Sequence, residues 1–138
     1  MKSLLGAPMP RRARKGDAGY DMYLPDDLTI KKGQRPVIDT GIAMEDGDIP
    51  EGYVAMIFPR SSMGLNYGLA MANSVPIIDQ GYRDTIKLKL WLNDPSVELL
   101  KLKKWDRICQ MVLIPFGTIA SEIPPEEERD GGLGSTGN

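Results

Sequence analysis

The sequence predicts an all-β fold, a jelly-roll-like β-barrel or sandwich. Its 15 glycines and 11 prolines are spread over 138 residues and separate the apolar runs, which leaves almost no room for a helix of ordinary length. The apolar runs are short, and several alternate apolar with polar side chains, as half-buried strands do. With 41% hydrophobic residues the chain can build one core, and we expect a single domain over residues 1–123.

Taken in order, the chain begins with a basic segment, residues 11–15, that has the composition of a solvated arm. Strand-like runs then alternate with turn clusters such as residues 46–48. The one helix that the pattern allows is a brief turn at residues 61–67, where the serines can cap it. We expect strands at residues 17–25, 28–30, 35–44, 53–58, 69–73, 75–78, 85–92, 97–102, 108–116 and 118–123.

The rest of the chain is organised around residues 71–84, which read MANSVPIIDQGYRD. An apolar run ends at Asp79, a Gln80-Gly81 turn follows, and the strand pattern resumes at Thr85. This pattern predicts a hairpin with a carboxylate at its bend, and the alternation over residues 85–92 predicts a buried face on its outgoing arm. The tip would offer Asp79 as a base and Tyr82 as a flat apolar surface to a small planar ligand.

The chain has no histidine and one cysteine, and these counts narrow the possible chemistry. Imidazole bases, Ser-His triads and His-ligated zinc are excluded, and we expect Cys109 to be a small buried apolar side chain. A general base is therefore a carboxylate, or less favourably Lys or Tyr. A metal ion would be a hard ion on oxygen ligands, with magnesium the first candidate. Asp21 is then either a surface charge or a carboxylate that supports magnesium.

The formal net charge of -2 argues against nucleic acid or an anionic membrane as a partner, since both require a basic surface. No apolar run approaches membrane-spanning length, and the apolar stretch at residues 4–7 is too short for a signal-peptide core. We therefore expect a cytoplasmic protein.

Residues 124–138 differ in kind from the rest of the chain, with prolines and glutamates followed by RDGGLGSTGN. This composition has little to bury and predicts a flexible glycine-rich C-terminal arm. The glycines also allow the backbone to fold around an anion, with Arg129, Ser135 and Thr136 as donors, so we interpret the arm as a phosphate-binding lid. Two other segments are rich in donors, Arg60 to Ser62 and Arg107 to Gln110.

Five segments in order give the chain a close resemblance to the trimeric deoxyuridine triphosphate nucleotidohydrolases, or dUTPases. The segments are AGYDM at 18–22, PRSSMG at 59–64, NSVPIIDQGY at 73–82, WDRICQ at 105–110 and GGLGSTG at 131–137. The resemblance implies a jelly-roll-like β-barrel that forms a homotrimer, with each active site shared between subunits and closed by a C-terminal arm. It implies hydrolysis of dUTP to dUMP and pyrophosphate, with Mg²⁺ as cofactor.

The resemblance also implies a role for individual residues. Asp79 would be the base that activates water, Tyr82 would lie beneath the deoxyribose, and Asp21 would support the magnesium ion through water. Asp106 and Arg107 would be structural, with a pairing to Arg60 across subunits. The other implied substrate-binding residues are Arg60, Ser61, Ser62, Asn73, Ile77, Ile78, Lys87, Gln110, Arg129, Leu133, Gly134, Ser135 and Thr136.

Three other functions are alternatives to dUTP hydrolysis. A deoxycytidine triphosphate deaminase, a sibling in the same superfamily, would need a glutamate at the pyrimidine ring, whereas residues 71–84 offer Asp79 and no glutamate. A dUTPase-like phage regulator would act by binding a protein partner, and the intact Asp79 and Tyr82 do not exclude such a partner. A binding module without chemistry fits five ordered motifs poorly.

Overall fold

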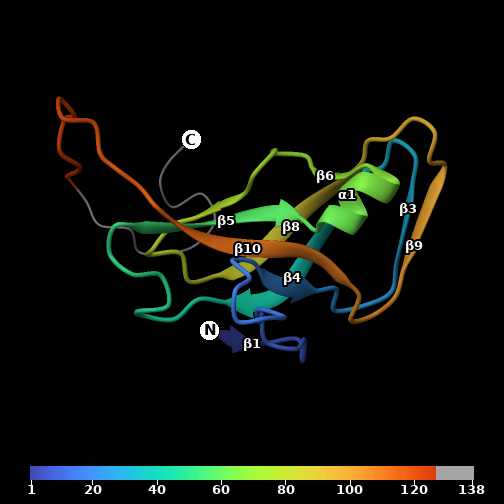
Figure 1. Ribbon diagram of the computed structural model, residues 1–138, viewed down its shortest axis with the longest axis horizontal. Coiled ribbons are helices and arrows are strands. Elements are labelled where there is room, and N and C mark those ends of the chain that lie inside the picture. Colours follow the sequence, from blue (N-terminus) through green and yellow to red (C-terminus); the bar gives the residue numbers. More distant parts are fainter. Residues whose placement is uncertain (127–138) are drawn as a thin grey trace.

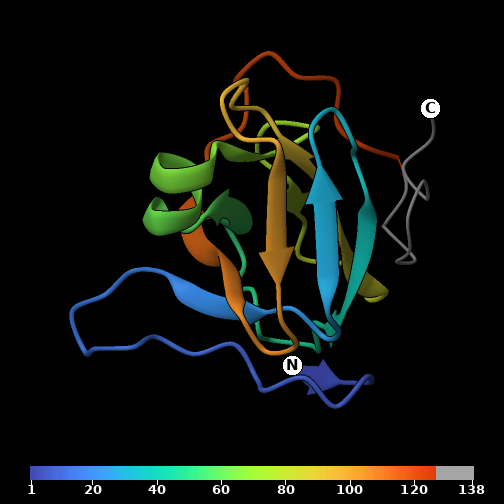
Figure 2. The same cartoon turned by 90° about the vertical axis from the view of Figure 1, so that its right-hand side faces the viewer.

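The computed structural model describes residues 1–126, and the expected all-β fold is confirmed. The molecule consists of two four-stranded sheets and a two-stranded ribbon that is attached to them (Figures 1 and 2). The first sheet has the order β1 (Lys2–Ser3), β4 (Val37–Ala43), β8 (Thr85–Leu92), β6 (Leu69–Met71). The second has the order β2 (Tyr20–Tyr23), β10 (Arg107–Pro115), β5 (Tyr53–Pro59), β7 (Ile77–Ile78). The ribbon pairs β3 (Leu28–Lys31) with β9 (Leu99–Leu102).

Both sheets contribute to a single apolar core. In β8, Ile86, Leu88 and Leu90 are fully buried while Lys87 and Lys89 are exposed, which confirms the predicted alternation. The second sheet contributes Ile57 and Ile108, which are also fully buried. Because every second side chain of a strand turns to the same face, the other face of the second sheet remains available to build a site.

The brief helix is confirmed as α1 (Ser61–Tyr67), directly after β5. Its N-cap residue is Arg60, in extended conformation, and no side chain caps the first turn, so the expected serine cap is wrong. At the other end Gly68 has φ 64° and donates its amide to the Gly64 carbonyl at 3.0 Å. A glycine suits this left-handed position because a side chain is disfavoured there.

The predicted hairpin at residues 71–84 is wrong. Its two arms belong to different sheets: β7 pairs with β5, with Ile78 opposite Ala55, whereas β8 pairs with β4 and β6. The turn at residues 79–82 therefore lies on a connection between sheets. Sequence periodicity identifies strands but not partners, and the partner of β7 lies about twenty residues earlier in the chain.

The strand expected at residues 118–123 is also wrong. The segment contains a turn, closed by the Glu122 amide and the Ile119 carbonyl at 3.0 Å, and it extends away from the sheets in Figure 1. Its apolar side chains Ile119 and Ile123 are 75% and 91% exposed. Apolar character alone predicted a strand, but a strand also requires a neighbouring edge to pair with. Within the described residues, no helix is long and apolar enough to cross a membrane.

Candidate active site

Three of the motifs meet in one pocket of roughly 340 Å³ on the outer face of the second sheet. Asp21 comes from β2, Gln110 from β10, and Arg60 and Ser61 from the junction of β5 and α1. The sheet order brings them together, because β10 lies between β2 and β5, with Gln110 opposite both Asp21 and Phe58. The pocket is lined by Ala13, Asp17, Ala18, Gly19, Asp21, Phe58, Arg60, Ser61, Gln110 and Val112.

Asp21 is the electrostatic centre of this pocket. It is 8% exposed, and its two carboxylate oxygens face different guanidinium groups. The Arg60 Nε lies 3.0 Å from Oδ1, and the Arg107 Nη1 lies 3.3 Å from Oδ2. The interpretation of Asp21 as a surface charge is therefore wrong. Within one subunit Arg107 contacts Asp21, and its expected pairing with Arg60 across subunits stays a prediction. Asp17 also lines the pocket, so its two aspartates balance the charge of Arg60 and Arg107, and the pocket would hold a phosphate through guanidinium donors that Asp21 orients rather than through excess charge.

Gln110 and the helix serines complete the donor set. The Gln110 Nε2 donates to the Pro59 carbonyl at 3.4 Å, which holds the amide at the pocket wall. Ser61 lines the pocket, and Ser62 is exposed one residue further along α1. Asp106 has the structural role expected of it, since its Oδ2 accepts a hydrogen bond from the Lys103 amide at 2.8 Å.

The second group of predicted residues surrounds the turn at residues 79–82. Asp79 is exposed, and its carbonyl accepts the Tyr82 amide at 3.1 Å, which closes the turn. Tyr82 is 6% exposed, and its hydroxyl donates to the Thr85 carbonyl at 3.0 Å. The Lys87 Nζ contacts the same carbonyl at 3.3 Å, so the tyrosine and the lysine are held together. Two further predicted residues, Asn73 and Ile77, are exposed, and Ile78 is buried.

The two groups lie at opposite ends of β5. Ile78 is opposite Ala55, and Arg60 follows the other end of the strand in extended conformation. At a rise of about 3.3 Å per residue, the backbones of Ile78 and Arg60 are roughly 16 Å apart, and Asp79 continues away from Arg60. A triphosphate is much shorter than this distance. One subunit therefore does not place its own Asp79 beside its own phosphate pocket.

Cys109 is a small buried side chain, as the sequence predicts. It is fully buried in β10, and burial raises the pKa of its thiol, with a further contribution from the nearby Asp21 carboxylate. Only the thiolate is strongly nucleophilic, so Cys109 is a packing residue.

Sequence reasoning missed several residues of the site. Gly19 lies so close to Gln110 that an added Cβ would be 3.0 Å from the glutamine Cδ, so only glycine leaves that side chain in place. Its signal was its position in the AGYDM motif. Arg83, which contacts the 79–82 turn, carried no signal beyond its place after Tyr82. The predicted residues Arg129, Leu133, Gly134, Ser135 and Thr136 lie outside the described residues.

Comparison with known proteins decides the family. The dUTPase family model matches residues 6–137. The chain belongs to the dUTPase family. It is 38% identical to the deoxyuridine 5'-triphosphate nucleotidohydrolase of Thermobifida fusca over 134 residues, which cover 94% of this chain and 73% of the relative. It is also 38% identical to the Mycobacterium leprae enzyme of that name over 141 residues, which cover 96% of this chain and 89% of the relative.

Solved dUTPase structures have the same fold. The dUTPase of Staphylococcus bacteriophage 80alpha superposes with a TM-score of 0.77 at 25% identity, covering 92% of this chain and 96% of the phage chain. That phage protein is described as controlling the transfer of virulence genes. A dUTPase mutant from phage phi11 of S. aureus, described as coordinating a structural Mg(II) ion, superposes with a TM-score of 0.73 at 25% identity, covering 91% of this chain and 94% of the phage chain.

Proposed function

We propose that this dUTPase hydrolyses dUTP to dUMP and pyrophosphate in an active site assembled from more than one subunit. The observation that supports the shared site is the separation along β5, with the Asp79 turn near one end and Arg60 of the phosphate pocket just past the other. In a symmetric oligomer the Asp79 turn of one subunit can complete the pocket of its neighbour. We assign the oligomer as the homotrimer typical of the family.

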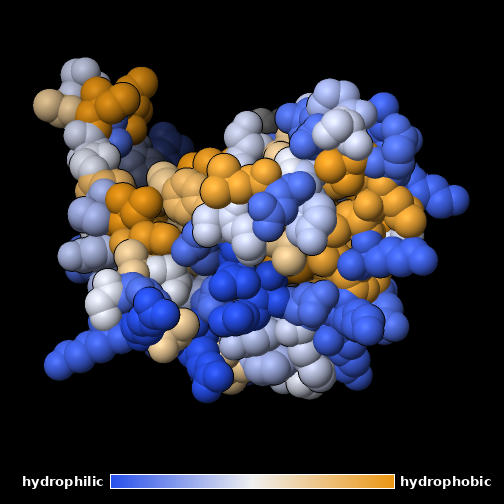
Figure 3. All heavy atoms as spheres, turned by 45° about the vertical axis from the view of Figure 1, so that its right-hand side comes forward, coloured by the Kyte–Doolittle hydropathy of each residue, from blue (hydrophilic) through white to orange (hydrophobic). Residues whose placement is uncertain are grey.

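The outer face of the second sheet supports this assembly. Met56 and Phe58 of β5 and Val112 and Ile114 of β10 are only half-buried, and their register places them side by side on that face. This apolar strip adjoins the phosphate pocket, because Phe58 and Val112 also line the pocket. Figure 3 shows hydrophobic side chains, in orange, in several groups at the surface. An apolar strip of this kind is typical of a surface that binds another subunit.

Each half of the shared site has its own task. Arg60, Ser61, Ser62 and Gln110 bind the phosphates, and Asp21 orients Arg60 and the structural Arg107 through the contacts at 3.0 and 3.3 Å. From the neighbouring subunit, Asp79 accepts the proton of the attacking water, which allows the water oxygen to bond to the α-phosphorus as pyrophosphate leaves. Tyr82 lies beneath the deoxyribose and excludes a 2′-hydroxyl. Asn73, Ile77, Ile78 and the strand near Lys87 contact the uracil edge, largely through main chain.

The residues present fit a magnesium ion that arrives with the triphosphate. Within residues 1–126 there is no cluster of three or more acidic, histidine or cysteine side chains that could hold an ion by itself. Magnesium commonly uses one or two carboxylates, several waters and the substrate phosphates. Asp21 is one of two aspartates that line the pocket, and because both of its oxygens face guanidinium groups it would contact such an ion only through water. When bound, magnesium neutralises charge on the phosphates.

Residues 124–138 are proposed to close the site, with Arg129, Leu133, Gly134, Ser135 and Thr136 covering the bound nucleotide. The cytoplasm is the proposed location, since nucleoside triphosphates are made and used there. A deaminase role is not supported, because the turn at residues 79–82 carries no glutamate. A regulatory protein partner is not part of the proposal: the bacterial enzymes named above are 38% identical, whereas the phage protein with a regulatory description is 25% identical.

The experiment that tests the activity is pyrophosphate release from dUTP with magnesium, compared with dCTP and dTTP. We expect release from dUTP alone, and ammonia release from dCTP would instead indicate a deaminase.

A mixing experiment tests the shared site. Asp79→Asn and Arg60→Gln should each be inactive alone, since each removes one half of every site. After the two proteins are unfolded and refolded together, about a quarter of the sites in random trimers should combine an intact Asp79 with an intact Arg60. No recovered activity would mean that one subunit supplies both residues.

A further inference from the structure

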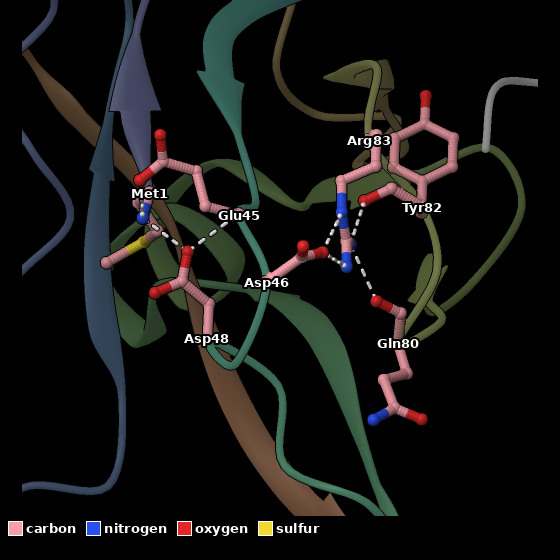
Figure 4. A network of polar contacts seen from close by, with 7 residues as sticks. All are labelled: Met1, Glu45, Asp46, Asp48, Gln80, Tyr82 and Arg83. Carbon is pink, nitrogen blue, oxygen red and sulfur yellow. Dashed lines mark hydrogen bonds and ion pairs between the residues drawn. The ribbon is translucent and has the colours of Figure 1, made fainter. Parts of the chain in front are cut away.

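We infer that Arg83 is a positioning residue that holds the catalytic turn at residues 79–82 in place. This inference rests on the proposed function, because it takes Asp79 as the base. Figure 4 shows the arrangement: the Arg83 side chain lies between the turn and the loop that carries Asp46.

The contacts of Arg83 reach both sides of the turn. Its Nη1 donates to the Gln80 carbonyl at 2.7 Å and to the Tyr82 carbonyl at 3.1 Å. The Tyr82 amide in turn donates to the Asp79 carbonyl at 3.1 Å. One guanidinium group therefore bonds Gln80, which directly follows Asp79, and Tyr82, whose ring is proposed to lie beneath the deoxyribose. A guanidinium group suits this task because its donors are planar, numerous and always charged.

The other edge of the guanidinium faces Asp46. The Arg83 Nε and Nη2 lie 3.2 and 2.7 Å from the Asp46 Oδ1. The Asp46 side chain is 99% exposed, and an ion pair at such a site is weak, so we assign it the smaller role of orienting the guanidinium. The loop itself is closed by the Asp48 carboxylate, which accepts the Glu45 amide at 2.8 Å.

The physical consequence concerns the direction of the Asp79 carboxylate. Asp79 is exposed on a turn between two sheets, so strand pairing does not fix its position. A base must lie within hydrogen-bond reach of its water, and a displacement of about 1 Å can lower a rate by ~10²-fold. Arg83 limits that displacement without contacting the reacting atoms.

The test is Arg83→Met, with Arg35→Met as the matched control. Arg35 is an exposed arginine, whereas Arg83 is half-buried, and the Arg35 guanidinium lies 4.3 Å from the Trp91 ring centroid rather than on the turn. We expect Arg83→Met to lower single-turnover hydrolysis by ~10–10²-fold while the affinity for a non-hydrolysable dUTP analogue changes by less than ~3-fold. Arg35→Met should keep both values. Arg83→Lys should fall between the parent and Arg83→Met, because an ammonium has its three donors on a single nitrogen and lacks the planar fork by which the guanidinium reaches the two carbonyls from one edge and Asp46 from the other.

A readout besides activity is amide hydrogen exchange over residues 79–83, which should become faster in Arg83→Met and stay unchanged in Arg35→Met. Parent-like turnover and exchange in Arg83→Met would overturn the inference. So would lost affinity with unchanged turnover, which would make Arg83 a ligand contact, or a loss in Asp46→Ala as large as that in Arg83→Met. If Arg83→Met does not fold, the same measurements are made on Arg83→Lys. A parent protein that does not hydrolyse dUTP would instead overturn the proposed function, and the exchange result would still test the role of Arg83 in the turn.

Discussion

Asp79 is the residue on which the proposed reaction depends. Asp79→Asn keeps the size of the side chain and its ability to hydrogen-bond, but the amide cannot accept a proton from water at neutral pH. We expect hydrolysis to fall by at least ~10²–10⁴-fold, the usual contribution of a positioned general base, while dUTP still binds. No histidine is present in the chain to replace it. Single-turnover pyrophosphate release and dUTP affinity check this prediction, and near-normal turnover would remove Asp79 from the mechanism.

Cys109 gives a second prediction for a single residue. Burial raises the pKa of its thiol, and the Asp21 carboxylate adds to that effect. Below the unfolded-state thiol pKa of ~8.5 the protonated thiol makes its whole contribution to the free energy of unfolding. As the pH rises from there towards the raised pKa, only the unfolded state loses the proton, so that contribution is lost. We expect no reaction of the native protein with a thiol reagent at pH 8 and complete reaction in denaturant. Rapid labelling of the native protein would contradict the buried position of Cys109.

At the scale of elements, the contact between β10 and the segment before β2 shapes the phosphate pocket. An added Cβ at Gly19 would lie 3.0 and 3.1 Å from Cδ and Cβ of Gln110. Gly19→Ala should therefore displace the Gln110 amide and weaken dUTP binding by ~10-fold, the value of one hydrogen bond to a charged group. Gly16→Ala is the control, since nothing lies within 4 Å of its Cβ. Calorimetric titration with the non-hydrolysable dUTP analogue measures the affinity of each variant. Equal affinities of Gly19→Ala and Gly16→Ala would contradict a role for Gln110.

The elements also differ in how well the sequence predicted them. The alternation of β8 identified its buried face, because the period of a strand is a local property. Helix α1 was predicted with its bounds, although its N-cap residue is Arg60. The pairing of β7 with β5 was missed, because pairing depends on contacts between distant parts of the chain.

At the scale of the whole molecule, the proposed site requires more than one subunit, and we assign the oligomer as a trimer. Light scattering of the purified protein should give about three times the mass of one chain, since Asp79 and the pocket of one subunit lie apart. A stable monomer with full dUTPase activity would contradict the shared site.

The C-terminal arm gives a further prediction at this scale. Truncation after Glu128 should leave thermal stability nearly unchanged, because the removed sequence is mostly glycine and small polar residues. Turnover should fall strongly through the loss of Arg129 and the glycine-rich lid. Turnover equal to that of the full chain would show that the arm takes no part in catalysis.

The sequence by itself determined the fold class, the buried face of β8 and the residue types that the chemistry can use. These follow from composition and from periods of a few residues, which are local properties. Only the tertiary structure decided that Asp21 lies between Arg60 and Arg107 and that Gln110 meets Gly19, because the order of strands in a sheet sets these contacts. It also decided that Asp79 and Arg60 lie near opposite ends of β5. The five motifs suggest one site, but the extended length of β5 separates these two residues within one subunit.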